Sequence, residues 1–154
     1  MQFYACNGMP MTEPLNATAD LLRVLGNENR LRILQALAGR ELCVCELVDA
    51  LGRAHYAVSR DLAALQKVGI IRERRVGSWV YHSVAPEAQA DPFRAELLQL
   101  VGRRLAGSAE AQADEARLAR RLALRNGDRC VVAVAELATQ APVQTDGALR
   151  RSSW

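Results

Sequence analysis

The sequence predicts a mainly α-helical fold with a β-hairpin. Half of the 154 residues are hydrophobic, only 5% are aromatic and there are 5 prolines, a balance typical of a folded helical protein. Apolar residues recur at helical spacing in most of the chain between residues 17 and 124. Between residues 70 and 84, β-branched and aromatic residues flank a Gly-Ser pair, which is typical of two antiparallel strands joined by a tight turn.

The first two predicted helices precede residue 40. Leucines at helical spacing predict a helix over 17–25, which ends at Gly26. Asn27 suits the N-cap of a second helix, because its side chain can accept hydrogen bonds from the first free main-chain N–H groups. Gly39 ends this second helix.

The next two helices are expected to form a helix-turn-helix. A short helix over about 44–51 stops at Gly52, and a longer one follows over about 56–68. One face of the longer helix is apolar, and its other face and start carry polar residues expected to contact DNA: His55, Tyr56, Ser59 and Arg60. The second helix of such a pair reads the major groove, where serine and arginine bind phosphates or base edges.

A basic hairpin follows the helix pair. Its strands are expected at 70–76 and 79–84, joined at Gly77-Ser78, and the first strand carries Arg72, Arg74 and Arg75. These three arginines are expected to contact DNA phosphates or the minor groove. A helix-turn-helix followed by a basic hairpin is a winged helix, so the predicted fold is a winged helix-turn-helix.

The C-terminal part reads as a linker, two helices and a tail. Prolines at 86 and 92 bracket the linker, and helices are expected over 93–105 and 109–124. The arginines between 117 and 125 are expected on a solvated face, and the segment 130–138 fits a strand or a helix equally well. The expected divisions are a flexible arm, a DNA-binding and dimerisation domain, a helical extension and a disordered tail: 1–13, 14–106, 107–138 and 139–154.

The lack of a membrane-spanning stretch and of a signal-peptide pattern favours a cytoplasmic protein. The net charge of +3 is by itself weak evidence for nucleic-acid binding. The longest uncharged apolar stretch, 130–135, is too short to cross a membrane, and residues 1–6 lack the basic and apolar parts of a signal peptide. In a reducing compartment, four cysteines favour metal or redox chemistry over disulfides.

Two cysteines lie two residues apart just before the helix-turn-helix, in the run Glu41–Leu47. Thiolates are soft and reactive ligands for metals. Because a helix turns about 100° per residue, Cys43 and Cys45 point about 200° apart. One ion held by both would strain or unwind the first helical turn, which would couple ligand binding to the shape of the DNA-reading unit. The pattern suggests a switch.

Several segments together resemble the ArsR/SmtB family of metal-responsive repressors, and within it the arsenic-operon repressors. They are ENRLRI (28–33), ELCVCEL (41–47), SRDLAAL (59–65), GII (69–71) and RRVGSWVY (74–81). The resemblance covers about residues 17–105. It implies a homodimer that pairs through the helices at 17–25 and 93–105, binds double-stranded operator DNA, and leaves it when a metalloid or metal binds the cysteines.

The resemblance also bears on the ligand set. Many arsenite-responsive relatives have a third cysteine where this chain has Val48, and trivalent arsenic prefers three thiolates. Relatives that sense cadmium or lead add cysteines from an N-terminal arm, a part that Cys6 could play here. Cys130 is the other candidate, although it also opens an apolar run and could be a small core residue. The expected inducer is As(III), with Sb(III), Cd(II) or Pb(II) as alternatives.

Other interpretations of the chain are less favoured. His55 and His82 could bind a soft metal, but DNA contact or plain exposure is expected for both. A repressor that senses thiol oxidation remains an alternative. An enzyme is not expected, because the chain has no CxxC pair, no loop that cradles an anion and no general base near the thiols.

Overall fold

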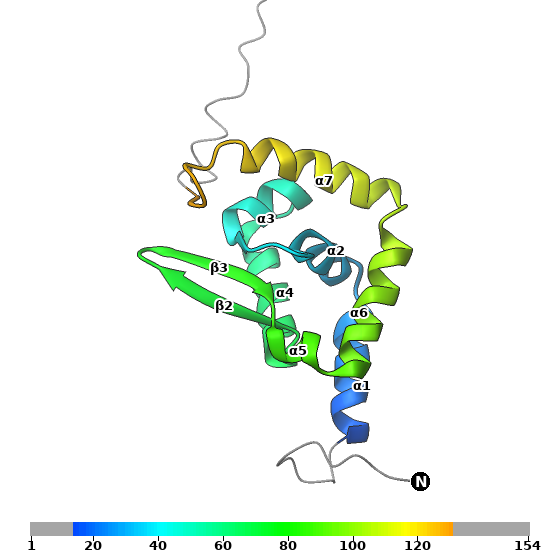
Figure 1. Ribbon diagram of the computed structural model, residues 1–154. Coiled ribbons are helices and arrows are strands. Elements are labelled where there is room, and N and C mark those ends of the chain that lie inside the picture. Colours follow the sequence, from blue (N-terminus) through cyan, green and yellow to red (C-terminus); the bar gives the residue numbers. More distant parts are fainter. Residues whose placement is uncertain (1–13, 131–154) are drawn as a thin grey trace, which may run out of the picture.

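A computed structural model describes residues 14–130 (Figure 1). The expected arm with Cys6, the segment 131–138 and the tail 139–154 lie outside the described residues. Within the described range, no helix combines the length and the apolar character needed to cross a lipid bilayer.

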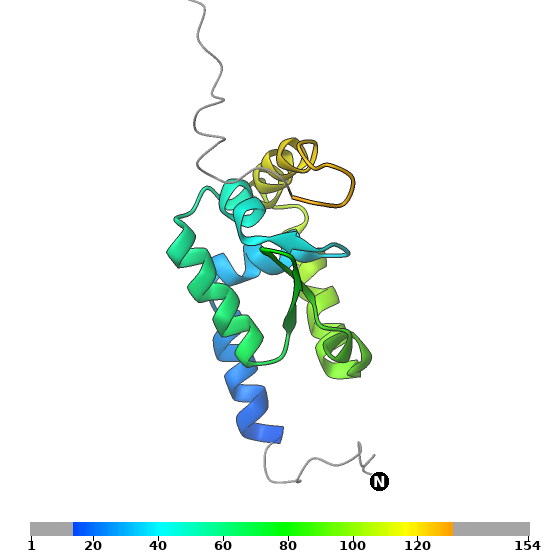
Figure 2. The ribbon, with the colours of Figure 1, turned by 90° about the vertical axis from the view of Figure 1, so that its left-hand side faces the viewer.

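The structure is mainly helical and carries one β-hairpin, as the sequence predicts. The elements in chain order are α1 (Pro14–Leu25), α2 (Glu28–Leu37), β1 (Leu42–Cys43), α3 (Val44–Leu51), α4 (His55–Lys67), β2 (Ile71–Val76), β3 (Trp79–Val84), α5 (Pro86–Ala90), α6 (Pro92–Leu105) and α7 (Ala109–Leu122). Helices α3 and α4 form the helix-turn-helix, and strands β2 and β3 form the wing. Viewed from the wing side, α4 and α1 lie side by side at one edge of the molecule (Figure 2).

The helix ends follow the predicted capping residues. The side-chain oxygen of Asn27 accepts hydrogen bonds from the N–H groups of Asn29 and Arg30, at 3.0 and 3.2 Å. Gly52 ends α3 with a φ of 61°, a left-handed conformation that glycine adopts without a steric cost. This turn sets the path of the chain from α3 into α4.

Strand β1 was not expected from the sequence. It pairs with β3, and the sheet order is β1-β3-β2, with Cys43 opposite Tyr81. Two residues are too few to show the alternation that identifies a strand. The pairing ties the first cysteine of the motif directly to the wing.

The predicted linker at 86–92 is also wrong, since Pro86–Ala90 forms the short helix α5. Pro86 occupies the first turn of that helix, where its missing N–H has no hydrogen bond to lose. Pro92 likewise begins α6.

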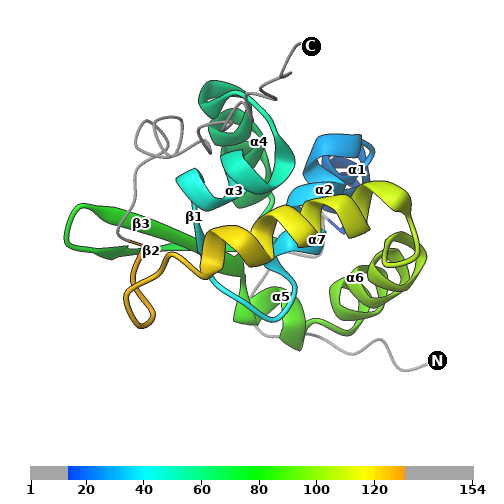
Figure 3. The ribbon, with the colours of Figure 1, turned by 90° about the horizontal axis from the view of Figure 1, so that it is seen from above.

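Helix α7 packs across α3 and α2 (Figure 3). Leu118 of α7 is fully buried in the same core as leucines of α2, α3 and α4. The expected solvated arginine face of α7 is wrong in part: Arg121 is only 4% exposed, and Arg117 and Arg125 are partly buried. Arg117 and Arg121 contact α3 because α7 turns the face that carries them toward the helix-turn-helix, and Arg125 contacts α3 from the segment that follows α7.

Candidate metal site and DNA-binding face

Cys43 lies at the junction between β1 and α3. It is the N-cap residue of α3, and its side chain is only 2% exposed. Its main-chain N–H donates a hydrogen bond of 2.9 Å to Oε2 of Glu46, three residues later in the first turn. The first cysteine of the motif is therefore buried and fixed against the helix start.

Cys130 reaches the same place from the far end of the described chain. Its N–H donates to the hydroxyl oxygen of Tyr81 at 2.9 Å, and Arg121 donates to its sulfur at 3.5 Å. Cys43, Glu46 and Cys130 each offer one ligand atom, and these three atoms all lie within 4.8 Å of one another. The structure thus brings together two of the sequence-predicted cysteines, with a carboxylate beside them.

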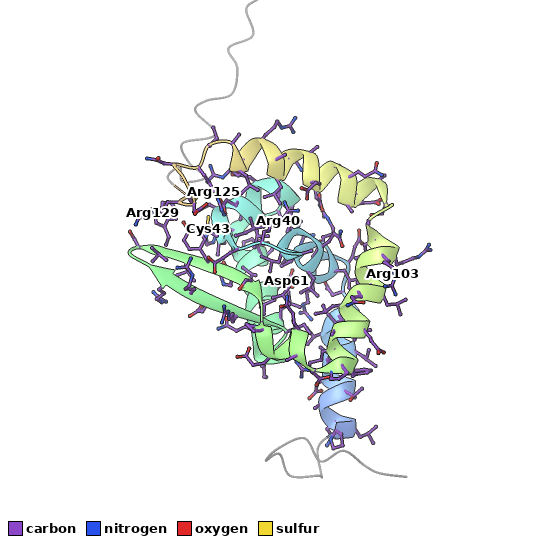
Figure 4. The ribbon with its side chains drawn as sticks, in the orientation of Figure 1. Arg40, Cys43, Asp61, Arg103, Arg125 and Arg129 are labelled. Carbon is purple, nitrogen blue, oxygen red and sulfur yellow. The ribbon has the colours of Figure 1, made fainter. Side chains whose placement is uncertain are left out.

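An arginine just after α7 neutralises that carboxylate. Arg125 donates to both oxygens of Glu46, at 2.6 and 2.7 Å, and to the main-chain oxygen of Glu41 at 2.8 Å. Its guanidinium also lies 5.9 Å from the ring centre of Tyr81. Figure 4 shows Cys43 beneath Arg125, between α7 and the wing. Glu46 is fully buried, and the paired guanidinium offsets the cost of burying its carboxylate.

The surroundings of Cys43 keep its thiol protonated. Burial raises the pKa of Cys43, and a hydrogen bond with Cys130 raises it further, while the N–H of Glu46 opposes both effects. A metal that binds here must displace the proton. Soft cations and trivalent arsenic bind thiolates strongly enough to do this, whereas hard cations prefer oxygen ligands.

Cys45 is placed differently from Cys43. It is half-buried and packs at the edge of the cluster of Cys43, Tyr81 and Cys130, but it does not belong to the group of donor atoms within 4.8 Å. Cys43 has an extended backbone, with φ −83° and ψ 164°, and α3 begins at Val44, so the 200° separation expected for two helical residues does not apply to this pair.

Sequence reasoning missed Glu46 and Arg125. A glutamate three residues after an N-cap position is the signal of a capping box, and it could have identified Glu46. No sequence signal marks Arg125, because its contacts depend on how α7 packs.

The exposed face of α4 carries the residues predicted to bind DNA. His55, Tyr56 and Arg60 are exposed, with Tyr56 at 75%, and Ser59 is half-buried. The opposite face is buried, and it includes Asp61, which pairs with Arg30 of α2 at 3.1 Å. The core-facing side fixes α4, which leaves the polar side available for a groove of DNA.

The wing arginines fall on two faces of the hairpin. Because side chains alternate along a strand, Arg72 and Arg74 share one face of β2 and Arg75 lies on the other. Arg74 is ion-paired with Glu41, and this pairing lowers the pKa of Glu41. Arg72 and Arg75 are exposed.

The expectation that His82 is exposed or contacts DNA is wrong. His82 is 5% exposed on β3, and its Nδ1 has no hydrogen-bond partner among the described residues. Burial lowers the pKa of His82, and Glu73 opposes this effect. His82 lies on the central strand β3, between Leu42 of β1 and Glu73 of β2.

Comparison with known proteins identifies the family. The family model described as bacterial regulatory protein, arsR family, matches residues 27–73. The arsenic resistance transcriptional regulator ArsR1 of Pseudomonas putida is 41% identical over 68 residues, which are 44% of this chain and 53% of that protein. The chain belongs to the arsR family of bacterial regulatory proteins. Its relatives are transcriptional regulators, and none of those named here is described as an enzyme.

Two further matches concern the inducer and the fold. The cadmium resistance transcriptional regulatory protein CadC of Listeria innocua is 30% identical over 44% of this chain and 58% of its own length. The solution structure of a homodimeric winged helix-turn-helix DNA-binding domain from Mycobacterium bovis matches with a TM-score of 0.52 at 27% identity, over 68% of this chain and 94% of that one. The chain thus spans little more than half the length of the two curated relatives, and its fold is a winged helix-turn-helix.

Proposed function

We propose that this protein is a DNA-binding repressor of a metal(loid)-resistance operon. In this proposal it acts in the cytoplasm, binds double-stranded operator DNA, and is released when As(III) or Sb(III) binds cysteine thiolates. The observation that carries the proposal is the position of Cys43, a buried thiol that caps the first helix of the helix-turn-helix and lies beside a second thiol, Cys130. A ligand at Cys43 acts directly on the unit that positions α4.

DNA binding is proposed to use α4 and the wing. Helix α4 lies in the major groove, where Ser59 and Arg60 contact base edges or phosphates and His55 and Tyr56 lie near the helix start. Arg72 and Arg75 are exposed on the wing and suit flanking phosphates.

The protein is proposed to act as a homodimer through α1 and α6. Large apolar side chains are exposed on these two helices: Leu15, Leu22, Phe93 and Leu100. Helix α6 has no fully buried residue within one chain, so a second subunit would cover apolar surface that water now contacts. A two-fold dimer requires an imperfect palindrome with half-sites about 34–36 Å apart.

Release follows from a competition between DNA and the inducer. Cys43 and Cys45 supply two thiolates, and a third comes from Cys130 or Cys6. Cys43 is the N-cap residue of α3 and Cys45 lies in its first turn, outside the group of close donor atoms, so holding both on one atom deforms the start of that helix. The inducer must favour the released state by about 1–3 kcal/mol or more to lower operator occupancy usefully.

Two alternative signals could act on a repressor of the same fold. Cd(II) or Pb(II) could occupy a site of four thiolates, and the similarity to a cadmium resistance regulator supports this alternative. Oxidation of neighbouring thiols could also release DNA, but burial of both Cys43 and Cys130 disfavours it, since oxidants react with exposed thiolates.

The test is fluorescence anisotropy of the reduced protein on DNA from upstream of its own gene. Arsenite, antimonite, cadmium, lead, zinc and peroxide are titrated separately. Release by stoichiometric arsenite or antimonite, lost in Cys43→Ser and in Cys45→Ser while both variants still bind DNA, supports the proposal. Release by peroxide alone favours the oxidation alternative, and tight binding that no compound reverses contradicts a metal switch.

A further inference from the structure

Three arginines, two on α7 and one just after it, contact α3, the helix that Cys43 caps. Arg117 donates to the main-chain oxygen of Ala50 at 2.7 Å, and Arg121 pairs with Asp49 at 3.0 Å. Arg125 binds Glu46 through two hydrogen bonds. Arg117 and Arg121 are four residues apart on one face of α7, and Arg125 continues the contact with α3 from the segment just after the helix. The C-terminal end of α7 is therefore held at the start of the helix-turn-helix.

We propose that this C-terminal segment completes the inducer site. Cys130 is the third thiolate, it forms a pre-positioned pair with Cys43, and the ion pair between Glu46 and Arg125 positions the two thiols. The inference rests on the proposed function and specifies its ligand set.

The distance between the donors fits one soft atom. A thiolate binds a zinc-sized ion at about 2.3 Å, so two thiolates on one tetrahedral ion lie about 3.8 Å apart. The ligand atoms of Cys43, Glu46 and Cys130 already lie within 4.8 Å of one another, so each pair closes by about 1 Å or less. Two buried thiols from distant parts of the chain need little movement to share a ligand.

Cys45 joins this pair only with a change in α3. Its sulfur is outside the donor group, although the residue packs against the same cluster. A ligand bound to Cys43 and Cys130 is thus completed by a rotation or unwinding of the first turn of α3. That movement displaces the helix that supports α4, whereas binding to the pre-positioned pair alone does not.

The chemistry requires no oxidant or reductant. Arsenous acid, As(OH)₃, exchanges each hydroxyl for one thiol: one As–O bond breaks, one As–S bond forms, and the thiol proton leaves with the hydroxyl as water. Three exchanges, at Cys43, Cys130 and Cys45, release three water molecules and leave arsenic trivalent. A divalent soft cation instead releases one proton for each thiol bound.

Arg125 is a positioning residue because it acts on both thiols through other groups. It binds the carboxylate of Glu46, which accepts the N–H of Cys43. It also lies over the ring of Tyr81, whose hydroxyl accepts the N–H of Cys130. Without the guanidinium, the buried charge of Glu46 loses its partner and both main-chain anchors loosen.

The test uses the full-length protein with and without DNA. Cys130→Ser, Cys130→Ala, Cys45→Ser, Cys6→Ser and Arg125→Gln are compared with Arg129→Gln, a matched control that removes the same charge from an exposed side chain next to Cys130. Without DNA, two readouts are measured: the thiols protected from a thiol reagent by one equivalent of arsenite, and the thiolate-to-metal absorption band that cadmium produces. On DNA, arsenite-induced release is measured by anisotropy.

We expect arsenite to protect three thiols in the natural sequence and two in either Cys130 variant. Releasing either Cys130 variant from DNA should require at least 100-fold more arsenite than releasing the natural protein. Arg125→Gln is expected to weaken cadmium and arsenite binding about 10–100-fold, as for residues that orient metal ligands, and Arg129→Gln to leave it unchanged. If arsenite releases both Cys130 variants from DNA normally but does not release Cys6→Ser or Cys45→Ser, this inference is overturned and the proposed repressor function is not. Protection of Cys43 and Cys130 by arsenite without release from DNA supports the site and contradicts the proposed function.

Discussion

The ion-pair network beneath α7 gives a prediction that can be worked out from the structure. The side chain of Asp114 is 7% exposed, and its carboxylate accepts hydrogen bonds from Arg32, twice at 2.7 Å, and from Arg117 at 2.5 Å. Hydrogen bonding to Asp114 raises the pKa of Arg32. Replacing Asp114 with Asn preserves the volume but removes the charge that faces both guanidinium groups.

The expected cost of Asp114→Asn is about 2–3 kcal/mol of the free energy of unfolding. Removing one partner of a fully buried ion pair costs about 3–5 kcal/mol. Here the side chains of Arg32 and Arg117 remain 19% and 36% exposed, so water compensates for part of the loss. The adjacent Glu115 supplies a matched control: it forms two hydrogen bonds of 3.0 Å with Arg40, but its side chain is 52% exposed. Glu115→Gln is expected to cost less than about 1 kcal/mol.

Urea denaturation followed by circular dichroism measures both variants, with the free energy obtained by linear extrapolation. All samples need the same protein concentration, because a dimer makes apparent stability depend on it. Equal losses in the two variants, within about 0.5 kcal/mol, would refute the reasoning that burial makes the Asp114 contacts strong.

Three further predictions concern stability and DNA binding. Leu118→Ala should cost about 3–4 kcal/mol in the same urea assay, because Leu118 is fully buried; a loss below about 1 kcal/mol would place α7 outside the core. Burial lowers the pKa of His82 below its usual 6.5. As the pH falls below 6.5, the unfolded chain therefore takes up a proton that the folded protein does not, and the free energy of unfolding should decrease. His82→Gln should reduce this loss in urea titrations between about pH 7.5 and 5.5, whereas the exposed His55→Gln should not; equal curves for both would contradict the assignment. Arg75→Ala should weaken operator binding and reduce the salt dependence of binding by about one phosphate contact. Arg74 is already ion-paired within the protein, so Arg74→Ala should change the salt dependence less. Anisotropy at several salt concentrations distinguishes the two variants.

Local patterns in the sequence determined the helix-turn-helix and the wing. The periodicity of apolar residues, the cap at Asn27 and the left-handed glycine at Gly52 act over a few residues, so they are visible without the fold.

Only the tertiary structure decided what surrounds Cys43. Strand β1 exists because β3 pairs with it, and Cys130 reaches Cys43 because α7 packs on α3 and delivers the following segment to Tyr81. Arg125 illustrates the same point: as one of the arginines between 117 and 125 it suggested a solvated surface, and in the fold it neutralises a buried glutamate. The physical reason is that helices and turns are encoded by neighbours in the chain, whereas burial and ion pairing depend on which surfaces meet, and no local period records that choice.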